Sequence, residues 1–69
     1  MHFRLANNKN NVVLEYKDDD INYDIAFFEL EYRDGEYLLI KNDTGEILIQ
    51  FTKDNILYYD QDYYIEMEV

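Results

Sequence analysis

The stretch from Asp18 to Glu29 carries oxygen-bearing side chains at the spacing of calcium ligands. Counted from Asp18, the third, fifth, seventh and twelfth positions of a twelve-residue loop are Asp20, Asn22, Asp24 and Glu29. Carboxylate and amide oxygens in this pattern can coordinate Ca²⁺. Such a loop also needs a sharp turn with positive φ at its sixth position, where glycine is favoured. This chain has Tyr23 there, and its bulky side chain makes that conformation costly.

An EF-hand loop must also be followed by a helix that starts near its last ligand. Residues at helical spacing are present, namely Ile21, Ile25, Phe28 and Tyr32. A second, alternating apolar set leads directly into the turn at Asp34-Gly35 without a helix cap, namely Ala26, Phe28, Leu30 and Tyr32. We therefore predict a strand here and interpret Asp18, Asp19 and Asp20 as a charged turn between strands, with calcium binding as the less favoured alternative.

Other catalytic and metal-binding chemistry lacks the necessary residues. The sequence has no Ser and no Cys, and His2 is its one histidine, which excludes Ser-His-Asp and Cys-His arrangements and the usual zinc sites. The two glycines, Gly35 and Gly45, both fall in predicted turns, so no phosphate-binding loop is present. A carboxylate pair could act in acid–base catalysis, but a chain this short has little room for a substrate cleft. We expect no enzyme, no cofactor and no metal.

Length and composition indicate one folded acidic domain over residues 1–69. Sixteen acidic and six basic residues give a net charge of −10, yet 48% of the residues are hydrophobic, with eight Tyr and four Phe. That is too apolar for a disordered acidic tail. Such a charge repels nucleic acid and anionic membranes and attracts basic surfaces. The lack of cysteine, of a signal peptide and of a long apolar run leads us to expect a cytoplasmic protein that does not enter membranes.

The pattern of Val, Ile, Tyr and Phe between turn residues predicts an all-β fold. We expect a small antiparallel sheet of about five or six strands, curled into a sandwich or open barrel. The predicted strands are residues 2–5, 11–17, 23–33, 36–41, 46–52 and 62–69. Residues 56–59 fit either a short strand or one helical turn, and four residues are too few for periodicity to decide.

Two turns predict the register of the central strands. A two-residue type I′ turn at Asp34-Gly35 pairs Arg33 with Glu36, Tyr32 with Tyr37, Glu31 with Leu38, Leu30 with Leu39, and Glu29 with Ile40. A three-residue loop ending at Gly45 pairs Asn42 with Glu46, Lys41 with Ile47, Leu39 with Ile49, and Tyr37 with Phe51. Both turns place one apolar set on the same face: Phe28, Leu30, Tyr32, Tyr37, Leu39, Ile47, Ile49 and Phe51.

The reverse face of this sheet carries Leu38, Ile40 and Leu48 among acidic side chains. We expect the N-terminal strands or the C-terminal strand to fold over this patch, which would complete the core. The alternative is a binding patch with an acidic rim. In the C-terminal strand, one side is predicted to face the core and carries Tyr63, Ile65, Met67 and Val69. The other side is predicted to face outward and carries Tyr64, Glu66 and Glu68.

Acidic side chains two positions apart on a strand lie about 6.8 Å apart on one face, which is about two nucleotide steps along a DNA strand. They can imitate phosphates toward Arg and Lys, although solvated strand faces show the same spacing. Exposed Tyr can anchor an interface or simply complete a thin core. The predicted partner-binding residues are Asp18, Asp19, Asp20, Asp24, Glu29, Glu31, Tyr59, Asp60, Asp62, Tyr64, Glu66 and Glu68.

In size, charge and aromatic content the whole chain is similar to the small acidic inhibitors of phages and mobile elements, the DNA-mimic and anti-CRISPR proteins. This resemblance rests on no motif, so it assigns no residue. It implies a non-enzymatic inhibitor, monomeric or homodimeric, that binds a basic nucleic-acid-handling protein or nuclease and not nucleic acid itself. The alternative is a structural or assembly module that uses an apolar sheet face or edge, and a calcium-responsive domain is the third possibility.

Overall fold

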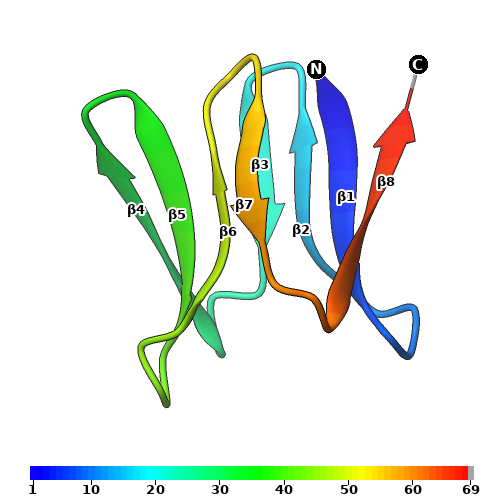
Figure 1. Ribbon diagram of the computed structural model, residues 1–69, viewed down its shortest axis with the longest axis vertical. Helices are drawn as coiled ribbons and strands as arrows, with labels where there is room; N and C mark the ends of the chain where they lie inside the picture. The colour runs from blue at the N-terminus through cyan, green and yellow to red at the C-terminus, as the bar shows by residue number, and fades with distance from the viewer. Residues whose placement is uncertain (69) are drawn as a thin grey trace.

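The computed structural model describes residues 1–68, which form eight β-strands and no helix (Figure 1). The strands are β1 (His2–Asn7), β2 (Val12–Lys17), β3 (Asp20–Tyr23), β4 (Phe28–Arg33), β5 (Glu36–Lys41), β6 (Ile47–Phe51), β7 (Ile56–Tyr59) and β8 (Tyr63–Glu68). One four-stranded sheet has the order β3-β2-β1-β8, and the other has the order β4-β5-β6-β7. The predicted all-β class is confirmed, in the form of a small sandwich.

Every strand pair is antiparallel, and each pair except one joins strands that follow each other in the chain. The exception is β1 with β8, which places the start of β1 beside the end of β8, where His2 pairs with Glu68 (Figure 1). The strand count exceeds our prediction for two reasons. Residues 20–23 form a strand of their own, β3, so the predicted run 23–33 keeps only β4 and the loop before it, and residues 56–59 form strand β7, one of the two possibilities left open for them.

Two-residue turns close the hairpins β2–β3 and β4–β5. Asp18 and Asp19 have φ of 49° and 68°, and Asp34 and Gly35 have φ of 50° and 83°. Positive φ at both central positions is the type I′ geometry, which Asp and Gly tolerate best. All five predicted pairs of β4 with β5 are confirmed, from Arg33 with Glu36 to Glu29 with Ile40.

Residues 18–29 do not form an EF-hand loop. Asp18 lies in the β2–β3 turn, whereas Glu29 lies in β4 of the other sheet. The EF-hand needs a helix after its last ligand, and strand β4 occupies that position. The interpretation that we favoured, a charged turn between strands, is confirmed for Asp18 and Asp19 by their positive φ, but Asp20 is the first residue of strand β3 and pairs with Lys17.

The β5–β6 connection follows the predicted register only in part. The pairs Leu39 with Ile49 and Tyr37 with Phe51 are confirmed, but Ile47 lies opposite Ile40 instead of Lys41 because a β-bulge interrupts the ladder. A bulge adds one residue to one strand and re-aims its side chains. Leu48 is consequently buried at 1% exposure, while Ile47 is 37% exposed. The predictions that Ile47 faces the core and Leu48 the reverse side are both wrong.

The core lies between the two sheets and contains an aromatic cluster. Phe51 of β6 contacts Phe3 of β1 edge-to-face at 5.2 Å between ring centroids, stacks on Tyr37 at 5.2 Å, and lies 5.5 Å from Tyr16 of β2. The aliphatic part of the core comes from both sheets: Leu5, Leu14, Leu39, Leu48 and Ile49. The terminal strands therefore cover the face of Leu39 and Phe51, and not the Leu38 and Ile40 patch as we predicted.

On the reverse face, Leu38 is still shielded, with 6% exposure. Its cross-strand partners are Glu31 and Gln50, and Gln50 donates a hydrogen bond to the carboxylate of Glu36. Long side chains can cover apolar neighbours in this way while their polar ends stay in water. Ile40 is half-buried. Leu38 is thus shielded within the chain itself.

Two further residues differ from the predicted pattern. Met67 of β8 is 56% exposed, although Tyr63 and Ile65 of the same strand do pack against the core as predicted. The same prediction for Val69 lies outside the described residues. Tyr32 of β4 is 62% exposed and leans on Tyr37, with 4.6 Å between ring centroids. Both residues lie near the ends of strands at a sheet edge, where the opposite sheet no longer covers them.

The hydroxyl of Tyr16, whose side chain packs in the core, makes stability sensitive to alkaline pH. Burial raises the pKa of Tyr16, and the charge of Asp19, which accepts its hydrogen bond at 3.3 Å, raises it further. A raised folded-state pKa contributes stability that is complete below the unfolded value of about 10 and is lost as pH rises through the folded value. We expect the urea midpoint of the wild type to fall in this range more steeply than that of Tyr16→Phe.

The matched control is Tyr32→Phe, which removes an exposed hydroxyl and should keep the alkaline slope of the wild type. Urea titrations followed by circular dichroism from neutral pH to above pH 10 test this prediction. Parallel curves for the wild type and Tyr16→Phe would contradict it.

Candidate functional site: the Tyr/Asp edge

The predicted partner-binding residues do not form one continuous array. Strand β4, with Glu29 and Glu31, and strand β8, with Glu66 and Glu68, belong to different sheets and lie on opposite sides in the view of Figure 1. The others lie in connections between strands or at strand ends: Asp18, Asp19, Asp20, Asp24, Tyr59, Asp60, Asp62 and Tyr64. The contacts of each group decide which carboxylates are available to a partner.

Glu66 and Glu68 already form ion pairs with a basic side chain of the same protein. The guanidinium of Arg4 in β1 lies 3.2 Å from Glu66, contacts Glu68, and lies 3.1 Å from Glu15 of β2. Its pKa is raised, chiefly by the hydrogen bond to Glu66 and then by the charge of Glu68. Arg4 stands opposite Glu15 and Glu66 on its two neighbouring strands. These acids therefore act first as cross-strand partners within the sheet.

His2 extends the same cluster. Its Nε2 lies 3.2 Å from Oε2 of Glu15, and the pKa of Glu15 is lowered mainly by this hydrogen bond, with a smaller contribution from Arg4. On the other sheet, Glu31 forms an ion pair with Arg33 two residues away. Our sequence reasoning missed Arg4 and His2 because their partners come from strands that are distant in the sequence.

Asp24 has a structural role in the β3–β4 loop. Its carboxylate accepts a hydrogen bond from the amide of Ala26 at 3.1 Å, and its carbonyl accepts one from the amide of Phe28 at 3.0 Å. Such an Asx turn makes the backbone follow a fixed path. The loop holds two apolar side chains in solvent, Ile25 at 76% exposure and Phe27 at 65%.

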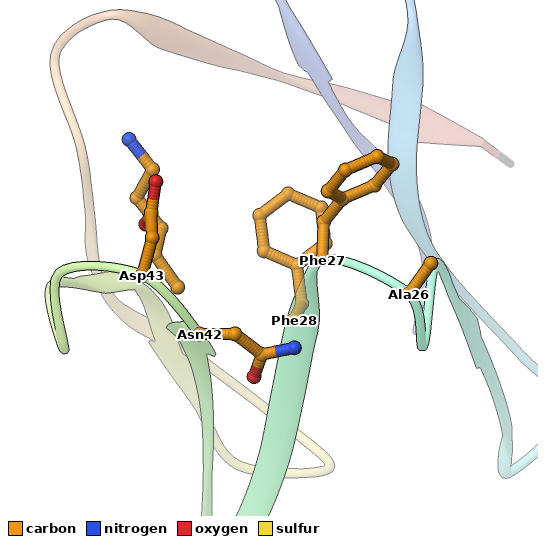
Figure 2. Close-up of a pocket in the computed structure, with 6 residues that line it drawn as sticks. Ala26, Phe27, Phe28, Asn42 and Asp43 are labelled. Atoms are coloured by element: carbon orange, nitrogen blue, oxygen red, sulfur yellow. The ribbon is translucent and has the colours of Figure 1, made fainter.

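An open hollow of about 410 Å³ lies next to this loop, bordered by Phe27 and Phe28 on one side and by Lys41, Asn42 and Asp43 on the other. Figure 2 shows the Phe28 ring between Phe27 and Asp43 in this view. The Asn42 amide donates to the carbonyl of Phe27 at 3.0 Å and so joins the two walls. Sequence analysis did not predict this loop, because it assigned residues 23–33 to one continuous strand, whereas residues 24–27 connect β3 and β4.

The segment from β7 into β8 presents aromatic and acidic side chains together. Leu57, Tyr58 and Tyr59 are 50%, 48% and 46% exposed. Asp60 and Asp62 follow in the connection between the two sheets. We call Leu57, Tyr58, Tyr59, Asp60, Asp62 and Tyr64 the Tyr/Asp edge.

Hydrogen bonds hold the Tyr/Asp edge in place. The Asp60 amide donates to the carbonyl of Leu48 at 2.8 Å, and the Asp60 carboxylate accepts from the amide of Asp62 at 2.8 Å. The hydroxyl of Tyr64, which is 39% exposed, donates to Asn10 at 2.7 Å. Within residues 1–68, neither Asp60 nor Asp62 forms an ion pair. The Asp60 carboxylate is therefore held in position, and both carboxylates are open to an external cation.

In the part of the chain that the structure describes, no three histidine, aspartate or glutamate side chains gather in a geometry that would hold a metal ion. The same part contains no helix of the length and apolar character needed to cross a membrane. No family model, curated protein or solved structure matches this chain. The function must therefore be argued from the chemistry of the Tyr/Asp edge.

Proposed function

We propose that this protein is a non-enzymatic inhibitor that binds a basic, nucleic-acid-handling protein through the Tyr/Asp edge. The observation that carries the proposal is the contrast between two kinds of carboxylate. Glu31, Glu66 and Glu68 already contact Arg33 or Arg4, whereas Asp60 and Asp62 lie beside half-exposed tyrosines without a cation of their own within residues 1–68.

The chemistry of this edge suits a basic protein surface. Aspartate carboxylates form strong charge-assisted hydrogen bonds with Arg and Lys, and tyrosines are common anchors at protein interfaces. The net charge of −10 steers the chain toward positive surfaces and away from nucleic acid. The basic grooves of nucleases and other nucleic-acid-binding proteins are such surfaces, and occupying one excludes its substrate. A phage or mobile-element inhibitor of the DNA-mimic kind fits this behaviour.

The test removes the two charges without disturbing the fold. The double variant D60N/D62N keeps an oxygen at position 60 that accepts the amide of Asp62. The matched control D43N/E46Q removes two charges from the β5–β6 connection. Each hydrogen bond to a charged group contributes about 1.5–3 kcal/mol of free energy. We therefore expect D60N/D62N to bind the target at least about tenfold more weakly than the wild type does. The control should bind about as tightly as the wild type.

The measurement is capture of target proteins on immobilised protein from a bacterial lysate that has been treated with nuclease. We expect the captured protein to bind DNA, to be released by high salt, and to be displaced by added duplex DNA. Equal capture by D60N/D62N and by the control, or capture that resists both salt and DNA, would reject the proposal.

One observation favours the assembly-module alternative, namely that β7 is a sheet edge with exposed apolar side chains. Apolar association persists or strengthens at high salt, whereas contacts between exposed charges weaken. Sedimentation velocity of the purified protein at low and high ionic strength separates the two. A dimer or larger assembly that is retained in high salt would favour the assembly module over the inhibitor.

A further inference from the structure

We infer that strand β7 is a docking site for an extended basic segment of the target, which pairs with β7 as an added strand. This inference rests on the proposed function and names its mode of recognition. Strand β7 pairs with β6 on one side, and in residues 1–68 it is one of four edge strands, with β3, β4 and β8. Adding a strand to an open sheet edge is a recurring mode of peptide recognition.

Strand β7 differs from the other three edges in its side chains. Charged residues protect an edge against pairing with foreign strands. Such residues are present in the other edges: Asp20 in β3, Glu29, Glu31 and Arg33 in β4, and Glu66 and Glu68 in β8. Strand β7 has the sequence ILYY and carries no charge. It is therefore the edge with the least electrostatic protection in the described chain.

The hydrogen-bond pattern shows which backbone groups of β7 face outward. The Asp60 amide donates to Leu48 at 2.8 Å, and Tyr58 lies opposite Gln50 in the same register. Bonded and non-bonded pairs alternate along an antiparallel ladder. Tyr59, between them, thus directs its N–H and C=O away from β6. A bulge between Gln50 and Phe51 interrupts the ladder nearer the start of β7, so docking should centre on Tyr59.

Charge complementarity identifies the occupant as basic. Asp60 and Asp62 follow β7, and Asp54 lies two residues before it, next to Lys53. A second copy of the chain is disfavoured because each copy carries a net charge of −10. A segment that alternates apolar and basic residues would place its apolar side chains against Leu57 and Tyr58 and its cations near the aspartates. Main-chain hydrogen bonds to Tyr59 would then supply affinity. The aspartate carboxylates would supply specificity for basic residues.

The experiment uses the wild-type protein and a short peptide of alternating lysine and valine as the probe. A second peptide of the same sequence, N-methylated at every residue, keeps the charge and loses the main-chain donors. We expect the first peptide to bind about tenfold more tightly than the second, because strand pairing needs those donors. We also expect it to slow hydrogen exchange of the Tyr59 amide about tenfold, as measured by NMR.

Repeating both titrations with D60N/D62N separates the inference from the proposed function. If the two peptides bind equally and D60N/D62N weakens both, strand addition is rejected while the acidic recognition surface stands. If neither peptide binds, both the docking mode and the proposed recognition surface fail. If the first peptide keeps its tenfold advantage but D60N/D62N binds it as tightly as the wild type does, strand addition stands and the proposed recognition surface fails. Because the comparison of the two peptides uses the unaltered protein, a folding defect cannot imitate a loss of strand addition.

Discussion

Replacing Phe51 with alanine is expected to lower the free energy of unfolding by about 3–5 kcal/mol, the usual cost of truncating a buried Phe. Phe51 is fully buried and touches Phe3, Tyr16 and Tyr37, so one ring joins both sheets. A domain of this length has roughly 3–10 kcal/mol of stability in total. The substitution should therefore unfold a large fraction of the molecules at room temperature.

Urea denaturation followed by circular dichroism measures this effect. The matched control is Phe27→Ala, the same substitution at a side chain that is 65% exposed. Substitutions at exposed positions usually change stability by less than about 0.5 kcal/mol. Similar losses for the two variants would contradict the placement of Phe51 at the centre of the core.

The second large effect is expected at Leu48, where the structure departs from the alternating pattern. Leu48 is 1% exposed and Ile47 is 37% exposed because of the bulge between β5 and β6. Leu48→Ala should lower the free energy of unfolding by about 2–5 kcal/mol. Ile47→Ala removes a largely solvated side chain and should cost about 1 kcal/mol or less.

Each variant serves as the control for the other, since both shorten an aliphatic side chain in the same strand. The measurement is again the urea midpoint with the slope of the transition, from which the stability difference follows. A larger loss for Ile47→Ala than for Leu48→Ala would show that β6 keeps the regular register and that the bulge is absent.

These stability predictions concern the scaffold on which the Tyr/Asp edge is built. Strand β6 connects the core to that edge, because Phe51 packs inside while the carbonyl of Leu48 accepts the amide of Asp60. A loss of packing at Phe51 or Leu48 should therefore also weaken target binding. The D60N/D62N variant should weaken binding while the urea midpoint changes little, which distinguishes a binding residue from a packing residue.

The sequence predicted features that depend on neighbours along the chain. The Asp34-Gly35 dipeptide favours a turn with positive φ at both positions, and this local preference sets the whole β4–β5 register. The charged turn at Asp18 and Asp19 follows from the same tolerance for positive φ. The residues Tyr59, Asp60, Asp62 and Tyr64 of the candidate site were selected from the sequence, because tyrosines beside aspartates are common at protein interfaces.

What the sequence determined by itself is the β class, the hairpin turns and the excess of negative charge, since each follows from residue types and short-range geometry. The tertiary structure alone decided the division into two sheets, the bulge that buries Leu48, and the neutralisation of Glu66 by Arg4 across 62 positions of sequence. Those features depend on packing and charge contacts between distant strands. Periodicity cannot report such contacts, because it describes one strand at a time.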